Sequence, residues 1–162
     1  VIRKFNGNKN IKILHVTGKK LYESFMDEIN EQKIHLENNI EIVEYMYDAA
    51  TALSASDIVI GSAGAITIAE ITALGVPAIL IPKTYTAENH QEYNARALEK
   101  EGAARVILER DLDGNTLIKE IEEIIDNKNL LKTMSTNSKR MGNADVENKI
   151  YESMLKLTVL KS

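Results

Sequence analysis

Short apolar runs alternate along the chain with longer segments whose apolar residues recur every three or four positions. Five of the short runs predict β-strands, at residues 11–16, 40–45, 57–60, 76–81 and 103–108. The third and fourth runs are almost wholly aliphatic, which is typical of strands that are covered on both faces of a parallel sheet. The pattern therefore indicates a buried sheet rather than a sheet with one solvent-exposed face.

The longer segments predict helices between these strands and after the last one. They lie at residues 21–29, 49–53, 65–74 and 89–101, and three closing helices lie around 117–125, 130–134 and 146–157. Gly75 and Pro77 mark the end of the helix at 65–74, because glycine favours a helix end and proline cannot continue it. The alternation predicts a single Rossmann-like α/β domain over residues 1–162, with a parallel sheet and flanking helices.

Composition limits the classes of protein that fit this pattern. With 162 residues, 44% hydrophobic and 27% charged, the chain suits one globular domain. The longest apolar run, at 76–81, is too short to cross a bilayer, and the first residues do not resemble a secretory leader. The absence of cysteine excludes disulfides and thiolate metal sites and fits the cytoplasm. The chain starts at Val1 without an initiator methionine, which suggests an excised segment.

The formal net charge of −4 argues against a nucleic-acid-binding protein, which normally presents a basic face. A phosphorylated small molecule is compatible with this charge, because one pyrophosphate needs only a few well-placed donors. Open parallel sheets bind ligands beyond the carboxyl ends of their strands. The loops after Tyr45, Ile60 and Ile81 are therefore the candidate binding loops, and no metal or other cofactor is predicted.

The loop after Ile60 reads Gly-Ser-Ala-Gly-Ala-Ile-Thr at residues 61–67 and leads into the predicted helix. Small residues let a ligand approach the backbone, and a helix start offers unpaired N–H groups and the positive end of the helix dipole. These features suit a pyrophosphate, although glycine and alanine also allow a plain tight turn. The loop matches neither the P-loop nor the dinucleotide fingerprint.

Glu70 favours the binding interpretation of this loop. It follows Thr67 by three residues, so the two side chains lie about 4.5 Å apart along one side of the helix. Thr67 would then bond a phosphate, and the carboxylate would accept hydrogen bonds from two vicinal hydroxyls such as those of a ribose. The alternative is a solvated surface charge. The neighbouring Ile68, Ala69 and Ile71 are apolar, so we expect Glu70 to be an isolated charge in an otherwise buried helix.

The loop after Ile81 leads into a helix that begins with amide side chains. Gln91 and Asn94 are three residues apart and can both donate and accept, which suits sugar hydroxyls. His90 is a candidate general base, phosphate donor or helix cap. No serine or second histidine completes a catalytic triad with it, so nucleophilic catalysis is not expected. His15 and His35 belong to no constellation and are expected to pack or face solvent.

Five segments resemble the MurG-type N-acetylglucosaminyltransferases in order and spacing. They read E-Y-M-Y-D at 44–48, D-I-V-I-G-S-A-G-A-I-T-I-A-E at 57–70, A-I-L-I-P at 78–82, H-Q-x-x-N-A at 90–95 and G-A-A at 102–104. The resemblance implies the C-terminal, donor-binding half of a two-domain GT-B glycosyltransferase. Such enzymes transfer N-acetylglucosamine from UDP-N-acetylglucosamine to the lipid-linked muramyl-pentapeptide, lipid I, with inversion, and form lipid II for peptidoglycan.

The resemblance also implies roles for individual residues. The backbone at Met46 would contact the uracil edge, and Glu70 would bind the ribose hydroxyls. The implied phosphate-binding block and the helix residues that continue it are Gly64, Ala65, Ile66, Thr67, Ile68 and Ala69. The implied contacts to the sugar or the diphosphate are His90, Gln91 and Asn94. The acceptor and the cytoplasmic face of a bacterial membrane would be bound by an N-terminal domain that this chain lacks, so no catalytic residue is expected within it.

Two departures from the family pattern bear on these expectations. Ser62 stands where the family usually has an arginine, and the Gly-Gly-Ser-x-Gly-Ala loop that opens the family's donor domain does not appear. We expect weak donor binding and no transfer by this chain alone. Two other hypotheses stay open: a free-standing donor subunit that needs a partner chain, as in the eukaryotic dolichol-linked enzyme, and a nucleotide-binding α/β module without transferase activity.

Overall fold

A computed structural model describes residues 1–85 and 89–142 of the chain. The helices and strands are α1 (Ile2–Phe5), β1 (Ile13–Val16), α2 (Tyr22–Glu31), β2 (Ile40–Val43), α3 (Ala49–Ser54), β3 (Val59–Gly61), α4 (Ala65–Leu74), β4 (Ala78–Leu80), α5 (His90–Lys100), β5 (Ala104–Val106), the 3-10 helix η2 (Glu109–Asp111), α6 (Gly114–Ile125) and α7 (Lys128–Met141). The predicted helix at 146–157 lies outside the described residues. The observed strands are shorter than the apolar runs that predicted them, because the hydrogen bonds between strands cover only part of each run.

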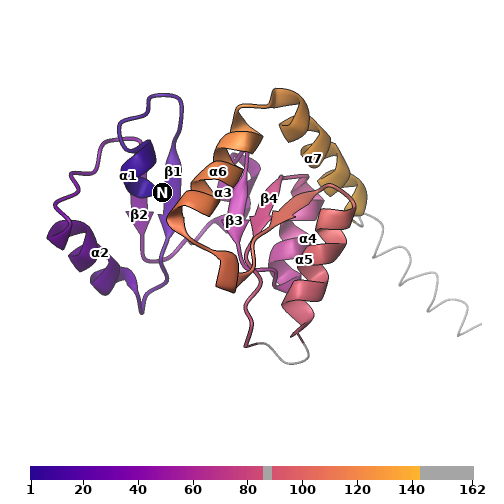
Figure 1. Cartoon of the computed structure of the whole chain (residues 1–162), viewed down its shortest axis with the longest axis horizontal. Helices are drawn as coiled ribbons and strands as arrows, with labels where there is room; N and C mark the ends of the chain where they lie inside the picture. The colour runs from indigo at the N-terminus through magenta and orange to yellow at the C-terminus, as the bar shows by residue number, and fades with distance from the viewer. Residues whose placement is uncertain (86–88, 143–162) are drawn as a thin grey trace, which may run out of the picture.

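Every strand pairing among the described residues is parallel, which confirms the Rossmann-like α/β class. The strands nevertheless form two hydrogen-bonded sheets instead of the single sheet expected (Figure 1). β1 pairs with β2 from Ile13 opposite Ile40 to Val16 opposite Val43. β4 lies between β3 and β5 in a second, three-stranded sheet. The apolar pattern predicts strands and their buried faces, but it does not specify which edges pair, and this explains the difference.

The centre of the three-stranded sheet is the most deeply buried part of the described chain. Ala78, Ile79 and Leu80 of β4 are fully buried, which confirms that this strand is covered on both faces. Ala78 and Leu80 pack in one hydrophobic cluster and Ile79 packs in the other, as the two-residue period of a strand requires. The same expectation is wrong for β3, because Ile60 is 41% exposed.

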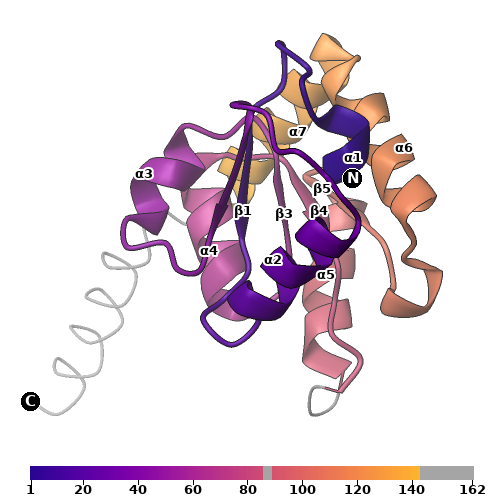
Figure 2. The ribbon, with the colours of Figure 1, turned by 90° about the vertical axis from the view of Figure 1, so that its left-hand side faces the viewer.

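Helices cover the two faces of this sheet as separate layers. Figure 2 shows α4 and α6 on opposite sides of β3 and β4. The cluster beside α4 and α5 includes Ile71 and Leu98, and the cluster beside α6 and α7 includes Ile124 and Met134. Among the described helices, none is both long enough and apolar enough to cross a membrane.

The predicted bounds of α4 are confirmed, and its end has a local cause. Gly75 adopts a left-handed conformation with φ of 75°, and its N–H bonds to the carbonyls of Ile71 and Thr72. A residue with a Cβ is strained in that conformation, so glycine is favoured there. Val76 and Pro77 then lead directly into β4, so the short turn holds the helix against the sheet. At the other end of the helix, residues 62–64 join β3 to α4, so the start of α4 lies at the carboxyl end of β3.

Candidate functional site

The N-terminus of α4 presents backbone N–H groups that the helix does not use. Gly64 is its N-cap residue, and no side chain caps it. The first bond inside the helix runs from the N–H of Ile68 to the carbonyl of Gly64. The N–H groups of Ala65, Ile66 and Thr67 therefore lie at the positive end of the helix dipole without helical acceptors. This is the geometry that the loop sequence predicts for an anion site.

Open space lies beside this loop. A Cβ added to Gly61 would meet nothing within 4 Å, and one added to Gly64 would meet only the Thr67 hydroxyl oxygen, at 3.9 Å. The fold therefore does not itself require glycine at these positions, since Gly64 also has an ordinary φ of −66°. A ligand that approaches the backbone closely would require glycine there, because a Cβ would obstruct it.

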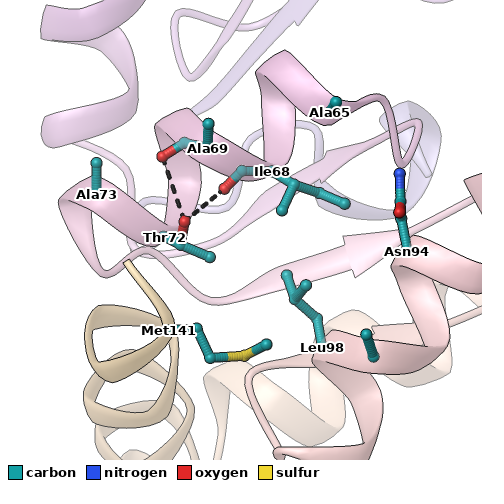
Figure 3. A pocket seen from close by; sticks show the side chains of 9 residues that line it. Ala65, Ile68, Ala69, Thr72, Ala73, Asn94, Leu98 and Met141 are labelled. Atoms are coloured by element: carbon teal, nitrogen blue, oxygen red, sulfur yellow. Dashed lines mark hydrogen bonds between the residues drawn. The ribbon is translucent and has the colours of Figure 1, made fainter. Parts of the chain in front are cut away.

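The predicted block 64–70 divides between two sides of α4. Ala65, Ile68 and Ala69 line a groove of about 550 Å³ between α4 and α5 (Figure 3). The other residues that line it are Thr72, Ala73, Asn94, Ala97, Leu98 and Met141. Thr67 and Glu70 do not line this groove, since they lie on another side of the 3.6-residue helical repeat. The block cannot present all its side chains to one ligand.

The groove lacks the polar character of a sugar site. The Thr72 hydroxyl donates to the carbonyls of Ile68 and Ala69, at 2.7 and 3.3 Å, as the dashed lines in Figure 3 show. The Asn94 amide donates to the carbonyl of Ala63 at 3.4 Å. Both polar side chains that line the groove are thus bonded to backbone within the protein. The start of α4, with Thr67 and Glu70, is the better candidate surface for a polar ligand.

Glu70 is exposed, and the expectation that it stands alone in a buried helix is wrong. Ala69 beside it is exposed too, and Ile66 one turn earlier is 77% exposed. The helix is apolar on every side, which is typical of a helix buried all round. The described chain nevertheless covers only the side of α4 that carries Ile71 and Thr72. The carboxylate of Glu70 is therefore accessible to a ligand.

The two predicted binding loops meet in the structure. Asn94 joins them, because its hydrogen bond to Ala63 links the first part of α5 to the loop before α4. Gln91 holds its own loop, since its Oε1 accepts from the backbone N–H of Lys83 at 3.0 Å. That bond leaves the Nε2 group of Gln91 as the donor for a ligand. His90 is the first residue of α5 and is exposed.

Met46 lies in the loop between β2 and α3, at the carboxyl end of the two-stranded sheet. It is half-buried, and the residues on either side of it are exposed tyrosines. The Tyr45 and Tyr47 rings pack edge to face with centroids 4.9 Å apart, and the Lys19 ammonium lies 5.4 Å from the Tyr45 centroid. α3 follows this loop and packs against α4.

The sequence interpretation missed this aromatic group and a second feature, a carboxylate that holds the loop after β4. The alternation Tyr45-Met46-Tyr47 was the available signal for the first. Glu109 of η2 is the second, since one of its oxygens accepts both from the Thr84 N–H, at 2.9 Å, and from the Thr84 hydroxyl, at 2.7 Å. Nothing in the sequence marks this pair, because 25 residues separate its members.

Protonating Glu109 is expected to release Thr84. The two hydrogen bonds from Thr84 hold the pKa of the Glu109 carboxyl below its usual value of 4.5. A lowered pKa in the folded state means that the bonds are intact above the usual range and are lost as the pH falls through the lowered pKa. The amide resonance of Thr84 should therefore titrate with a midpoint below 4.5 in an NMR pH series.

Glu109→Gln is the matched control for this titration. It keeps one acceptor oxygen without a titrating charge, so the Thr84 resonance should no longer follow the carboxyl. A wild-type midpoint at or above 4.5 would contradict the expectation that the two hydrogen bonds from Thr84 lower the pKa of the Glu109 carboxyl.

The remaining histidines take structural positions. His15 packs against Phe25 with ring centroids 4.8 Å apart, and its burial lowers its pKa. His35 is exposed, and its carbonyl accepts from the Asn6 side chain at 2.7 Å. Both placements confirm that these rings pack or face solvent. Within the described ranges, no three metal-ligating side chains gather closely enough to hold an ion.

The sequence is similar to curated proteins of one name. The chain is 46% identical over 150 residues to the UDP-N-acetylglucosamine--N-acetylmuramyl-(pentapeptide) pyrophosphoryl-undecaprenol N-acetylglucosamine transferase of Clostridioides difficile (strain 630). This match covers 93% of this chain and 36% of that protein. It is 42% identical over 151 residues to the protein of the same name from Thermoanaerobacter sp. (strain X514), which covers 93% and 42% respectively. The chain thus spans about two fifths of the length of these relatives.

The fold is similar to that of solved glycosyltransferases. The crystal structure of Acinetobacter baumannii MurG matches with a TM-score of 0.76 and 24% identity, over 90% of this chain and 43% of that one. The glycosyltransferase VinC in complex with DTDP matches with a TM-score of 0.66 and 14% identity, over 88% and 32%. At these identities the likeness shows the fold alone. The model of the glycosyltransferase family 28 C-terminal domain matches residues 2–150, so the chain belongs to this family.

Proposed function

We propose that the chain is the donor-binding domain of a glycosyltransferase and that its donor is UDP-N-acetylglucosamine. The observation that carries the proposal is the uncapped start of α4 beside the glycine loop. Family membership supports a nucleotide-sugar as the occupant, and the names of the relatives support N-acetylglucosamine as the sugar. Donor binding to these N–H groups needs no metal, because the helix dipole and the amides act on the diphosphate directly.

In this proposal each group binds the part of the donor that its chemistry suits. The N–H groups of residues 65–67 and the Thr67 hydroxyl bind the diphosphate, and the exposed Glu70 accepts from the ribose hydroxyls. The Gln91 Nε2 group and His90 contact the sugar or the diphosphate from the start of α5. Asn94 holds the two loops together through Ala63 and adds a contact at its carbonyl oxygen. The backbone at Met46 binds the uracil edge, beside the Tyr45 and Tyr47 rings.

The rest of the reaction is assigned to a second domain. The full-length protein would be a two-domain enzyme whose other half binds the lipid-linked muramyl-pentapeptide and supplies the general base. That half would make the membrane contact, at the cytoplasmic face of a bacterial membrane, and no nucleic acid would take part. The relatives' names, which include the pentapeptide and the undecaprenol carrier, support this acceptor. The domain described here would bind and orient the donor.

Titration with UDP-N-acetylglucosamine tests donor binding. Adding the nucleotide-sugar to the isotope-labelled chain should shift the amide resonances of Ala65, Ile66 and Thr67, because their N–H groups gain an anionic acceptor. UDP alone should shift the same resonances, and UDP-glucose should bind more weakly if the acetamido group is recognised. Unchanged spectra at millimolar UDP would overturn the proposal.

Two alternative functions make different predictions in a complementation assay. A donor half of a bacterial enzyme should transfer the sugar to lipid I when the N-terminal half of a relative such as the Clostridioides difficile protein is added. A free-standing subunit should need a different partner chain, and a non-catalytic module should bind UDP without supporting transfer in either mixture. Measurable transfer by this chain alone would contradict the assignment of the acceptor to another domain.

A further inference from the structure

One asparagine of the sequence, Asn6 in the loop between α1 and β1, is followed directly by a glycine. Asparagine is a thermolabile residue, because the backbone nitrogen of the next residue can attack the side-chain amide carbon. Glycine at that next position leaves the nitrogen unhindered, since it carries no Cβ and its backbone rotates freely. The pair Asn6-Gly7 is therefore the position of the chain at which deamidation is chemically most favoured.

The structure holds the Asn6 amide at both ends. Its Nδ2 donates to the His35 carbonyl at 2.7 Å, and its Oδ1 accepts from the Glu37 N–H at 2.9 Å. A ring between side chain and backbone can close only when the Gly7 nitrogen lies on the same side of the Asn6 Cα–C bond as Cβ and close to the amide carbon. The ψ of 127° at Asn6 places that nitrogen elsewhere, so both the amide and the backbone must rotate before they react.

The attacking nitrogen is held as well. The Gly7 N–H donates to Oδ1 of Asn39 at 2.8 Å, and Gly7 has a left-handed φ of 76°. Rotating the peptide between Asn6 and Gly7 toward the side chain would break this hydrogen bond. The bond to Asn39 therefore opposes the motion that deamidation requires.

The Asn39 side chain also holds the rest of the loop. Its Nδ2 lies within 3.2 Å of three carbonyl oxygens, those of Phe5, Asn8 and Ile11. Phe5 is buried in a hydrophobic cluster, and Ile11 packs against the same cluster. These contacts gather residues 5–11 around one side chain. Removing that side chain is therefore expected to open the loop while the two sheets stay intact.

We propose that Asn6 is a latent deamidation site, that Asn39 protects it in the folded chain, and that its deamidation releases the loop between α1 and β1. The Gly7 nitrogen forms a bond to Cγ of Asn6 and gives up its proton, and the bond from Cγ to Nδ2 breaks so that ammonia leaves with that proton. Water then opens the resulting succinimide at either of its two carbonyl carbons. The products are aspartate, or isoaspartate, in which the backbone is longer by one carbon.

Neither product restores the loop. A carboxylate accepts hydrogen bonds but has no N–H to donate, so the bond from residue 6 to the His35 carbonyl is lost and two acceptors face each other. Isoaspartate also displaces Gly7 from Asn39. The loop lies at the amino ends of β1 and β2, whereas the candidate donor site lies beyond the carboxyl ends of the strands. The inference is therefore independent of the proposed function.

Peptide mapping by mass spectrometry measures deamidation at Asn6 directly. The folded wild type should deamidate there at least about ten times more slowly than the same chain unfolded in urea, because several hydrogen bonds oppose the rotation. Asn39→Ala should raise the rate in the folded chain roughly tenfold, because the bonds to Gly7 and to the loop carbonyls are lost. Equal rates in the folded and the unfolded wild type would overturn the proposal.

Asn127→Ala is the matched control for a general loss of stability. Asn127 caps α7 by accepting from the Leu130 N–H at 3.0 Å, so this variant also loses an asparagine side chain but leaves the loop untouched. Urea unfolding measures the stability of both variants. If Asn127→Ala accelerates deamidation at Asn6 as much as Asn39→Ala does, global unfolding sets the rate and the proposal fails.

Hydrogen exchange of the wild type tests the protection without any substitution. The Gly7 amide should exchange slowly, because it donates to Asn39. Exchange at the rate of an unfolded chain would contradict the proposed protection, whatever the stability of Asn39→Ala.

Asn6→Asp tests the consequence of the reaction. It introduces the side chain of one product, which keeps an acceptor for the Glu37 N–H and lacks the donor to the His35 carbonyl. The Gly7 amide should exchange roughly tenfold faster than in the wild type. The Thr17 amide, which donates to the Val43 carbonyl between the strands, should be unchanged. Wild-type protection of Gly7 in this variant would show that deamidation leaves the loop in place and would overturn the proposal.

Discussion

Glu70→Ala is expected to weaken UDP binding by about 2 kcal/mol, or roughly thirtyfold, because a charged acceptor to two ribose hydroxyls is lost. The side chain is exposed, so its removal leaves no buried group unpaired and should leave the stability of the chain unchanged. Calorimetric titration with UDP measures the affinity, and urea unfolding measures the stability. The result separates a ligand contact from a structural one.

Two further variants sharpen this test. Glu70→Gln keeps the length of the side chain and one acceptor oxygen but removes the charge, so its affinity should fall between those of the wild type and the alanine variant. Glu31→Ala removes an exposed carboxylate from α2 and should leave the affinity unchanged. Wild-type affinity in Glu70→Ala would show that Glu70 is a solvated surface charge, which is the alternative that the sequence leaves open.

Gly142→Ala is expected to destabilise the chain by about 3 kcal/mol through overpacking. A Cβ at this position would collide with the Thr72 carbonyl oxygen and would lie 2.7 Å from its carbonyl carbon and 3.1 Å from the Ala73 nitrogen. These atoms belong to the backbone of α4, which cannot move aside as the end of a long side chain can. Either α7 or α4 must therefore shift.

The contact between α7 and α4 makes such a shift costly. The fully buried Ser138 donates to the carbonyls of Ile71 and Val76, and Ser135 donates to that of Gly75. These bonds would be stretched by any separation of the helices. Urea unfolding should show a lower midpoint with an unchanged slope. Gly114→Ala is the control, because a Cβ there meets nothing within 4 Å, and equal midpoints for the two variants would refute the expected clash.

The loop chemistry of the candidate site follows closely from the sequence. The apolar run before Gly61 and the unbroken segment up to Gly75 predict a strand, a small-residue loop and a helix, and the structure contains all three. Local physics decides each of them: side-chain period, the conformational freedom of glycine and the unpaired N–H groups of a helix start. The contact between this loop and the start of α5 fits the prediction that both follow parallel strands, beyond whose carboxyl ends ligands bind.

Other properties of the site depend on packing between distant segments. The sequence could not predict that Glu109 holds Thr84, since no local signal connects the two. The apolar neighbours of Glu70 predicted an otherwise buried helix, but the described chain covers only one side of α4. Nor could the sequence predict that the side chains of Ala65, Ile68 and Ala69 line the groove toward α5.

By itself, the sequence determined the order and type of the elements, the parallel α/β class and the uncapped start of α4 that is the candidate anion site. Each rests on interactions between residues close in the chain. Only the tertiary structure decided which strand edges pair, which side of α4 is covered and which carboxylates reach a loop. These depend on contacts between segments tens of residues apart, which a periodic pattern does not encode. The two separate sheets are the clearest case, since their strands were predicted but their division into two sheets was not.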